Sequence, residues 1–583
     1  MASPKPVCVL LRTLKVTPGR RLAIGVIAAL AGALLSAGGY ASAQSVQHLS
    51  ITQPGGFPGA PVMTGIQIVT NGVKLTWDGP AGYYQVYKKG LTDSKWVAVG
   101  GRTNLVRYLT INGPLTNSVF KVLGPTPQYA GATACAECHA GIQSTELKTG
   151  HAVAYDAINN LGQGKNASCL PCHTVGYNLT TGFKVVNNVV TTTHLKGVQC
   201  ESCHGPGGNH AANPDDPITR PRIEIAAEVC GGCHSGPKNP TFDEWKTTGH
   251  AIVSEDMNDP GRIETCGRCH SGSSRLAQLD GLRGSSLTNA VHGDANIGIT
   301  CAVCHEPHRV RSFTNVLNGV FRFTNALTGQ FITFTNRELG AVYTNQLRTA
   351  IASTKDFYLT TTDVLTNKFD RNINACAQCH NHRGASWTST SRPPHHSPQY
   401  NLLLGTVGEL SSGAAPNLPS THSRIEQQCV SCHMETSPHQ DGPPEVAAVT
   451  GHKFAADSYG MCAACHKDAT TAQGLVTFAK FATNYRIQLL KSWLDAWALM
   501  KGPNALVTKY GARAWEYTTP GELSPGGSGP DATEQAQIPN NIKKARFNLY
   551  LVLHDGSSGI HNAPYSAQLL DTALTWVQDE VNQ

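Results

Sequence analysis

Residues 62–124 contain short runs in which apolar and polar residues alternate, as they do when every second side chain of a β-strand faces a core. Turn sequences such as Asn71-Gly72 and Lys89-Gly90 separate the runs. Together they predict a small all-β sandwich. The expected strands are 65–69, 73–77, 83–87, 96–99, 107–111 and 118–122. The preceding residues 44–61 are rich in Gly and Pro and are expected to form a linker.

The end of the chain has a different pattern. Apolar residues recur at helical spacing over 474–500, 539–553 and 563–581, which predicts long helices within residues 471–583. The intervening residues 130–470 share no hydrophobic template, and residues 313–369, rich in Thr, Asn, Phe and Val, are expected to form a β-rich insertion. With 58 Gly and 33 Pro the chain is rich in loops. Such a chain can still be compact if something other than side chains fills its core.

The first 43 residues have the features of a secretory signal peptide. A basic stretch that includes Arg20 and Arg21 precedes an apolar run, 22–35, and Ala41-Ser42-Ala43 is a small-x-small cleavage site. An uncleaved N-terminal anchor is the alternative. Removing the five basic residues of 1–43 from the 46 in the chain leaves 41 against 39 acidic residues. No basic cluster remains that would indicate nucleic-acid binding. We expect a protein secreted across the inner membrane, periplasmic or extracellular.

Cysteine provides the chemical signal. Eighteen of the 19 cysteines form nine Cys-x-x-Cys pairs, and a His follows each pair directly. A single pair could bind zinc or act as a redox dithiol. Nine pairs that all end in His indicate haem c, whose vinyl groups react with the two thiols while the His becomes the proximal iron ligand. The sequence therefore predicts nine covalently attached haems.

The predicted attachment residues follow from the motif. The thiols are Cys135, Cys138, Cys169, Cys172, Cys200, Cys203, Cys230, Cys233, Cys266, Cys269, Cys301, Cys304, Cys376, Cys379, Cys429, Cys432, Cys462 and Cys465. The proximal ligands are His139, His173, His204, His234, His270, His305, His380, His433 and His466. The predicted fold is thus mixed: a small all-β sandwich, then a mostly α-helical and loop-rich nine-haem domain, 130–470, with long C-terminal helices.

Fifteen further histidines remain, and with His48 in the expected linker, 14 are available as distal ligands. Few of the six methionines lie free in the haem region, so bis-His coordination and low potentials are expected. Several candidates share a Gly-His-Ala element or stand close to a motif, and one is expected from the pair His395 and His396. The predicted distal ligands are His151, His194, His210, His250, His292, His308, His396, His422, His452 and His561.

Several segments resemble known families. Residues 200–210, Cys-Glu-Ser-Cys-His-Gly-Pro-Gly-Gly-Asn-His, and the Gly-His-Ala elements resemble the cytochrome c554 family. The late elements resemble pentahaem nitrite reductases and octahaem hydroxylamine oxidoreductases or tetrathionate reductases. That resemblance, over roughly 130–580, implies helices after the last motif and a distal ligand from Gly559-Ile560-His561-Asn562. The Leu-x-Trp strand ending at Trp77, followed by Tyr84-Gln85-Val86-Tyr87, resembles a fibronectin type III domain.

The chain also departs from these families. All nine motifs end in His, whereas nitrite reductases often carry a catalytic Cys-x-x-Cys-Lys haem. Nine haems exceed the five or eight of the families that it resembles. No Tyr is identifiable as the residue that hydroxylamine oxidoreductases cross-link to a haem.

Two functions fit this pattern. The first is an electron carrier in respiratory or extracellular electron transfer, with redox proteins as donor and acceptor. The possible partners are a membrane-associated quinol oxidase, an outer-membrane conduit, and further copies of the chain in a homo-oligomer or filament. The second is a reductase or oxidoreductase of nitrite, hydroxylamine or tetrathionate-like oxyanions at one five-coordinate haem. Its candidate catalytic residues are His382, Arg383, Arg392, His396 and Tyr400.

Overall fold

The computed structural model of the chain describes most of the region from residue 128 onward. The described residues are 9–10, the strands within 62–123 with 95–96, 128–308 without 217–218, 222, 224, 254 and 292–294, short segments between 313 and 348, and 376–583 without 412, 414–415, 417 and 426–428. The expected signal peptide and linker therefore lie outside the described residues, apart from β1 (Val9–Leu10). His292 also lies outside them.

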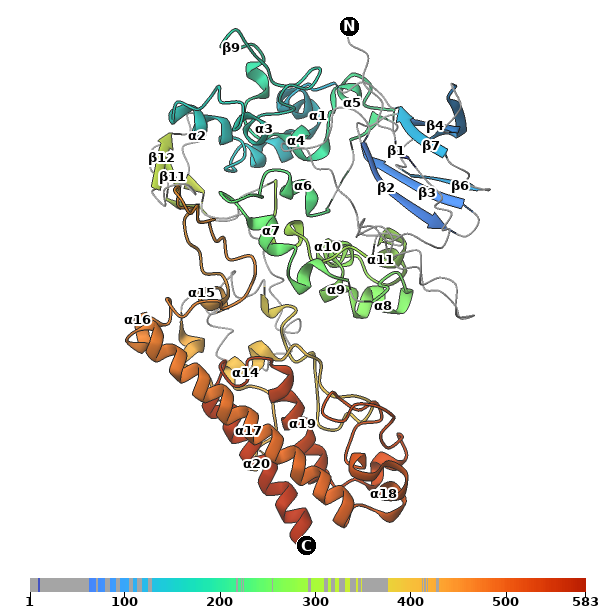
Figure 1. The fold of residues 1–583 in the computed structure, drawn as a ribbon, viewed down its shortest axis with the longest axis vertical. Helices are drawn as coiled ribbons and strands as arrows, with labels where there is room; N and C mark the ends of the chain where they lie inside the picture. Colours follow the sequence, from blue (N-terminus) through green and yellow to red (C-terminus); the bar gives the residue numbers. More distant parts are fainter. Residues whose placement is uncertain are drawn as a thin grey trace, which may run out of the picture. The chain divides into compact units, whose positions relative to one another are not determined.

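The N-terminal strands form two antiparallel sheets (Figure 1). One has the order β2-β3-β6 and the other β1-β7-β4-β5. Their bounds are β2 (Val62–Val69), β3 (Gly72–Asp78), β4 (Tyr84–Gly90), β5 (Val97–Thr103), β6 (Tyr108–Asn112) and β7 (Ser118–Leu123). Alternate residues of β3, among them Val73 and Leu75, pack in one hydrophobic cluster with Val86 and Phe120 from the other sheet. The six strands coincide with the six alternating runs of the sequence.

The described residues divide into two compact units. The first comprises Met1–Cys233, Pro307–Phe321 and Thr333–Tyr343, and the second comprises His234–Glu306, Arg322–Ile332 and Thr344–Gln583. Beyond its sheets, the first unit contains α1 (Ala132–Glu146), α2 (Ala154–Asn160), α3 (Leu170–His173), β8 (Val185–Val186), β9 (Val189–Val190), α4 (Cys200–His204), α5 (Gly208–Ala212) and α6 (Glu228–Gly231). These helices are short, so the mixed fold is loop-rich here.

Short helices also begin the second unit. They are α7 (Thr241–Trp245), α8 (Pro260–Thr265), α9 (Gly267–His270), α10 (Gly272–Leu279), α11 (Gly284–Val291), α12 (Cys301–Cys304), α14 (Gln399–Leu404), α15 (Cys429–His433) and α16 (Ala463–His466). Within the expected insertion the described strands are β10 (Phe313–Asn315), β11 (Val320–Thr324), β12 (Phe331–Thr335) and β13 (Val342–Tyr343), which pair as β10-β13 and β11-β12.

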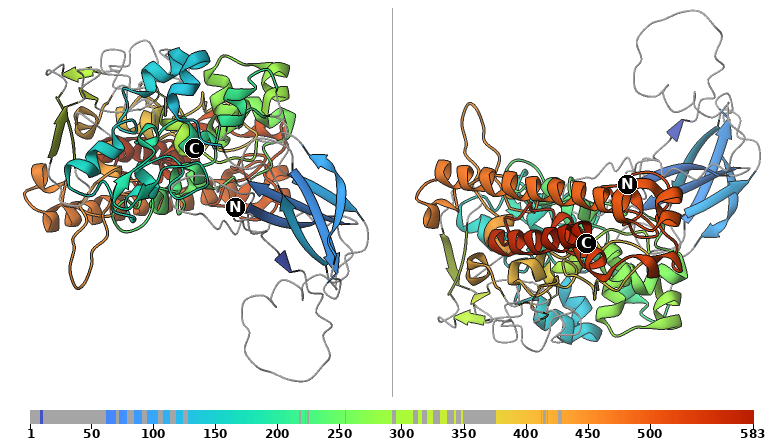
Figure 2. Two further views of the ribbon diagram at one scale, coloured as in Figure 1. Left: turned by 90° about the horizontal axis from the view of Figure 1, so that it is seen from above. Right: turned by 90° about the horizontal axis from the view of Figure 1, so that it is seen from below.

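Long helices end the chain. They are α17 (Ala469–Lys501), α19 (Asn540–His554) and α20 (Ala563–Asn582), and the short α18 (Asn504–Tyr510) lies between the first two in the sequence. The Asp468 carboxylate accepts a hydrogen bond from the Thr471 N–H and caps α17, and the Asn562 side chain caps α20 in the same way. α17, α19 and α20 lie side by side (Figures 1 and 2) around an apolar core that includes Leu490, Trp497 and Leu569. No helix among the described residues is both long and apolar enough to cross a membrane.

One cation lies inside this helical core. Arg546 on α19 is fully buried. Its guanidinium donates to the Trp515 carbonyl at 2.7 Å, the Glu516 carbonyl at 2.8 Å and Gln535 Oε1 at 2.8 Å. It also stands 4.1 Å from the centroid of the Tyr517 ring. Hydrogen bonds and a cation–π contact thus compensate for the loss of water around this charge.

Candidate haem-binding sites

Most Cys-x-x-Cys-His motifs lie on a single helical turn. α4 (Cys200–His204) and α15 (Cys429–His433) each span one complete motif, and α3, α9, α12 and α16 contain most of another. Residues three and four positions apart lie on the same face of a helix. The two thiols and the histidine of a motif therefore project from one side, as attachment to one flat ring requires.

Six motif histidines face a histidine from outside the motifs. The ring centroids lie 5.8–6.2 Å apart in every case. The pairs are His204–His308, 5.9 Å, His380–His250, 6.1 Å, His270–His395, 5.8 Å, His305–His452, 6.2 Å, His466–His422, 6.2 Å, and His433–His561, 6.2 Å. Tilted and edge-on ring contacts cover such distances too, but all six pairs fall within a narrow range.

This range is also the one expected for two imidazoles on one metal ion. Metal–imidazole bonds are about 2.0–2.1 Å long, and the ring centre lies about 1 Å beyond the nitrogen, so two imidazoles on one iron have centroids about 6 Å apart. The residues present therefore fit a haem iron held between a motif histidine and a second histidine.

Hydrogen bonds orient several of these rings. Nδ1 of His433 donates to the Phe454 carbonyl at 3.0 Å, and Nδ1 of His452 donates to the Thr450 carbonyl at 3.0 Å. Nδ1 of His422 donates to the Ile560 carbonyl at 3.2 Å. A carbonyl only accepts, so the proton stays on Nδ1 and Nε2 keeps its lone pair. This is the arrangement that second-sphere groups impose on metal-binding histidines.

His561 has a carboxylate in this role. Its Nδ1 lies 2.6 Å from Oδ1 of Asp555, and the Ser557 hydroxyl donates to the other carboxylate oxygen. Asp555 is 3% exposed. A hydrogen bond to an ionised acceptor is stronger than one to a carbonyl and places a negative charge behind the imidazole.

A second carboxylate holds the segment of His452. Glu244, buried on α7, accepts hydrogen bonds from the Thr450 N–H at 2.9 Å, the Thr450 hydroxyl at 2.8 Å and the His452 N–H at 2.7 Å. These three bonds satisfy the buried carboxylate and fix the backbone from which His452 faces His305.

Motifs that are distant in sequence lie next to one another. In the first unit, side-chain hydrogen bonds join Cys135 to Cys200 and Cys172 to Cys233. In the second unit they join Cys269 to Cys379 and Cys376 to Cys429. The fold therefore gathers the motifs, whereas a string of separate sites would keep them apart.

Three motif histidines have other neighbours. His139 lies close enough to His210 to lower the pKa of that imidazole, after the larger effect of burial. Nδ1 of His173 donates to the Ala154 carbonyl at 2.7 Å, and the Asn239 side chain contacts His234 at 2.8 Å. Two further predicted ligands, His151 and His194, lie in the first unit, in the turn after α1 and in the turn Thr193–Leu195.

The candidate catalytic residues gather partly around His270. Burial, then Arg383, His270, Arg392 and His396, lower the pKa of His395 to about 4, so both guanidinium groups lie close enough to act on the ring that faces His270. Arg383 has a backbone φ of 53°, a conformation that is strained for a side-chain-bearing residue, and donates to the Thr265 carbonyl at 3.2 Å.

The other candidates have different positions. His396 stacks on His554 at 3.6 Å, and it is the adjacent His395 that faces His270. The His382 N–H donates to Asn401 Oδ1 at 3.0 Å. Tyr400 is 3% exposed, and its N–H donates to the His380 carbonyl.

Sequence reasoning missed the acidic residues of these sites. Asp555 and Glu244 are single carboxylates without a motif, and no periodicity marks them as partners of a distal histidine. The preference for His395 over His396 also has no sequence signal, because adjacent residues of an irregular segment can face opposite ways.

Comparisons with known proteins agree with the motif. A family model described as cytochrome c554 and c-prime matches residues 134–205. The multihaem cytochrome MtrA of Shewanella baltica is 31% identical over 84 residues, 13% of this chain and 25% of MtrA. The C-type polyhaem cytochrome OmcC of Geobacter sulfurreducens is 34% identical over 77 residues, 12% of this chain and 10% of OmcC. The chain thus matches a quarter or less of the length of these relatives.

Two solved structures share similarity at low identity. The outer cell wall cytochrome OcwA aligns with a TM-score of 0.45 and 17% identity, over 77% of this chain and all of OcwA. The octahaem sulfite reductase MccA of Wolinella succinogenes aligns with a TM-score of 0.25 and 15% identity, over 66% of this chain and 53% of MccA. The nine motifs and the sequence similarities thus agree that this chain resembles multihaem c-type cytochromes.

Proposed function

We propose that the mature protein carries nine covalently attached haems, mainly bis-His, and passes electrons through them in respiratory or extracellular electron transfer. The observation that carries the proposal is the set of six motif histidines that each face a second histidine at about the spacing of two ligands on one iron. When bound, haem supplies a one-electron carrier whose potential the protein tunes through axial ligands, burial and hydrogen bonds.

The chain's own residues have three tasks in this function. The motif thiols fix each ring at two points. Backbone carbonyls keep the proton on Nδ1 of the motif histidine His433 and of the distal His422 and His452, and the buried Asp555 carboxylate does so for His561, so that Nε2 can bind the metal. Cysteines of different motifs lie next to one another, so neighbouring attachment sites are close, as transfer from one haem to the next requires.

The proposal includes the export and domain organisation. Residues 1–43 are a cleaved signal peptide, 44–61 a linker and 62–124 a fibronectin type III-like β sandwich. Residues 130–470 are the nine-haem domain, and 471–583 contribute His561 to it. The proposed location is periplasmic or extracellular, and the proposed partners are redox proteins. The names of the relatives, multihaem, polyhaem and outer cell wall cytochromes, support this assignment.

The experiment is a haem count on the exported protein. The chain is expressed in a host that matures c-type cytochromes and is recovered from the periplasm or medium. Intact mass spectrometry is expected to give the chain from residue 44 plus nine haems, and pyridine haemochrome analysis the same ratio. A Cys429→Ala/Cys432→Ala variant is expected to carry eight. Fewer than nine haems in the parent protein, with free motif thiols, would overturn the count.

A second function rests on the surroundings of His270. Two guanidinium groups, Arg383 and Arg392, lie near the face that His395 occupies, an arrangement that suits a small oxyanion. If His395 did not bind the iron of the haem attached next to His270, that haem would be the site of nitrite, hydroxylamine or tetrathionate turnover. Steady-state assays with reduced dye are the test, with Arg383→Gln and Arg392→Gln as variants. Absence of turnover in the parent protein would exclude this function.

A further inference from the structure

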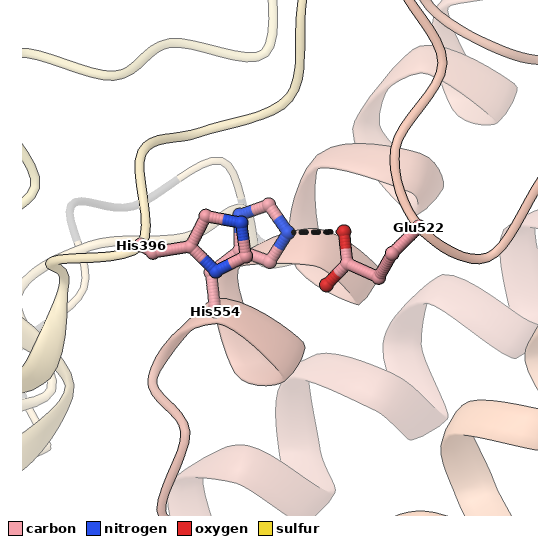
Figure 3. A group of neighbouring side chains, drawn as sticks. All are labelled: His396, Glu522 and His554. Atoms are coloured by element: carbon pink, nitrogen blue, oxygen red, sulfur yellow. Dashed lines mark hydrogen bonds and ion pairs between the residues drawn. The ribbon is translucent and has the colours of Figure 1, made fainter. Parts of the chain in front are cut away.

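Three side chains from separate segments of the second unit converge beside the haem region (Figure 3). His396 follows the Pro394–His395 segment, Glu522 lies in the loop before the turn Glu534–Gln537, and His554 ends α19. One nitrogen or oxygen from each lies within 4.8 Å of the others. None of the three belongs to a Cys-x-x-Cys-His motif, and none of them is needed for the six histidine pairs.

The hydrogen-bond partners of His554 leave one of its contacts with two acceptors and no donor. Its Nδ1 lies 2.6 Å from the Pro394 carbonyl, which only accepts, so Nδ1 carries the proton. In the neutral ring Nε2 then presents a lone pair. It nevertheless lies 3.0 Å from Oε2 of Glu522, whose carboxylate also only accepts. Two acceptors face each other, and the contact is favourable only with a positive species between or on them.

That species is either a proton or a cation, and the surroundings favour a cation. The His396 ring stacks on the face of His554, with centroids 3.6 Å and planes 21° apart, and one ligand atom of His396 lies within 4.8 Å of those of the other two residues. The lone pair of an imidazole lies in its ring plane, so the exposed His396 would swing out of this stack to bind the same cation. A Nδ1–H bonded to a carbonyl is also how proteins orient a histidine that binds metal through Nε2.

The geometry is close to that of a tetrahedral metal site. With bonds of about 2.0–2.2 Å, ligand atoms of a tetrahedral metal stand about 3.4 Å apart. Nε2 of His554 and Oε2 of Glu522 are 3.0 Å apart, close to that value, and the ligand atom of His396 lies within 4.8 Å of both. Only His554 is buried, while His396 and Glu522 are exposed, so solvent can take a fourth position and the two exposed side chains can adjust.

We propose that His396, Glu522 and His554 bind one divalent transition-metal cation of the zinc class. Two imidazoles with one carboxylate favour such ions over calcium or magnesium, which take oxygen ligands. The cation would link the end of α19 to the segment that carries His395, one residue away from the ring that faces His270.

The probe is zinc added to haem-loaded protein that carries no His tag. The protein is treated with chelator, equilibrated with a small molar excess of Zn²⁺ and separated from free metal. Elemental analysis is expected to give one zinc per chain beyond the haem iron. X-ray absorption at the zinc edge is expected to show two imidazoles among nitrogen and oxygen ligands.

Two exposed ligands allow variants that should fold. Glu522→Gln keeps the shape and offers an amide donor to Nε2 of His554, so that contact stays satisfied without a cation; His396→Asn removes the second imidazole. Each is expected to weaken zinc binding at least tenfold with haem content and circular dichroism unchanged. Glu264→Gln, at an exposed carboxylate of the same unit, is the matched control and should bind like the parent.

Three outcomes overturn the proposal. They are no zinc retained by the parent protein, equal zinc retained by the parent and both ligand variants, and an absorption spectrum without imidazole ligands. If haem content is normal and zinc is absent, the pair is a protonated His–Glu contact. Because haem content is measured separately, failure of the metal site is distinguishable from failure of the proposed cytochrome function.

Discussion

Asp555 provides a quantitative test of the proposed haem ligation. Replacing it with Asn retains an oxygen that can accept from Nδ1 of His561 and removes one negative charge. The carboxylate oxygen is 2.6 Å from Nδ1. The imidazole and a metal bond of about 2 Å add about 4 Å, so the charge lies about 6.5 Å from an iron bound between His433 and His561.

The expected shift follows from Coulomb's law. At an effective dielectric constant of about 20, a unit charge at about 6.5 Å stabilises the oxidised iron by about 2.6 kcal/mol relative to the reduced iron. Since a tenfold change in equilibrium for one electron corresponds to 59 mV, this equals about 110 mV. Removal of the charge disfavours the ferric form, so the potential of this one haem is expected to rise by about 100 mV.

The assay is a potentiometric titration followed by optical and EPR spectroscopy of parent and variant. One ninth of the total absorbance change on reduction should move to higher potential, and the midpoint potentials of the other haems should stay unchanged. Asp579→Asn, the same change at an exposed carboxylate of α20, is the control and should leave the titration as it is. A shift below about 30 mV, the value for this charge in bulk water, would refute the reasoning.

Three further changes test the fold and the ligand supports. Arg546→Leu leaves the Trp515 carbonyl and Gln535 Oε1 without the donor that Arg546 provides, and should lower the free energy of unfolding by about 2–6 kcal/mol. The measurement is denaturant titration with circular dichroism, and a loss below about 1 kcal/mol would contradict the role of Arg546. Glu244→Ala frees the segment of His452, at a cost of about 1–3 kcal/mol, and should produce high-spin iron at the haem of His305 in EPR spectra. Hydrogen bonds from Tyr510 and Lys509, then from the Asp531 N–H, lower the pKa of Glu534 to about 2. The contribution of the ionised Glu534 to stability is therefore complete above about pH 4.5 and disappears as the pH falls to about 2. The difference in denaturation midpoint between the parent protein and Glu534→Gln should narrow between these two pH values and stay constant above pH 4.5.

Local elements could be predicted from the sequence because local interactions specify them. The alternating runs between 62 and 124 coincide with β2 to β7, and the periodic stretch expected at 474–500 corresponds to α17, Ala469–Lys501. α17 begins earlier than the apolar period because Asp468 caps its N-terminus, a polar signal that a search for apolar spacing does not register.

The histidine pairs depend on tertiary structure. His250 and His380 are 130 residues apart and face each other at 6.1 Å. The sequence could identify both as ligand candidates from the Gly-His-Ala element and the motif, but it gave no means of pairing them. The supporting carboxylates Asp555 and Glu244 were beyond prediction for the same reason, since their role exists only once distant segments fold together.

Low-temperature EPR of the oxidised, fully loaded protein tests the central claim most directly. Spin integration against the haem count separates low-spin iron with two axial histidines from high-spin iron with an open position. We expect nine ferric haems per chain, with low-spin signals from at least the six that have a facing histidine. Predominantly high-spin iron, or low-spin spectra typical of His–Met ligation, would contradict the account.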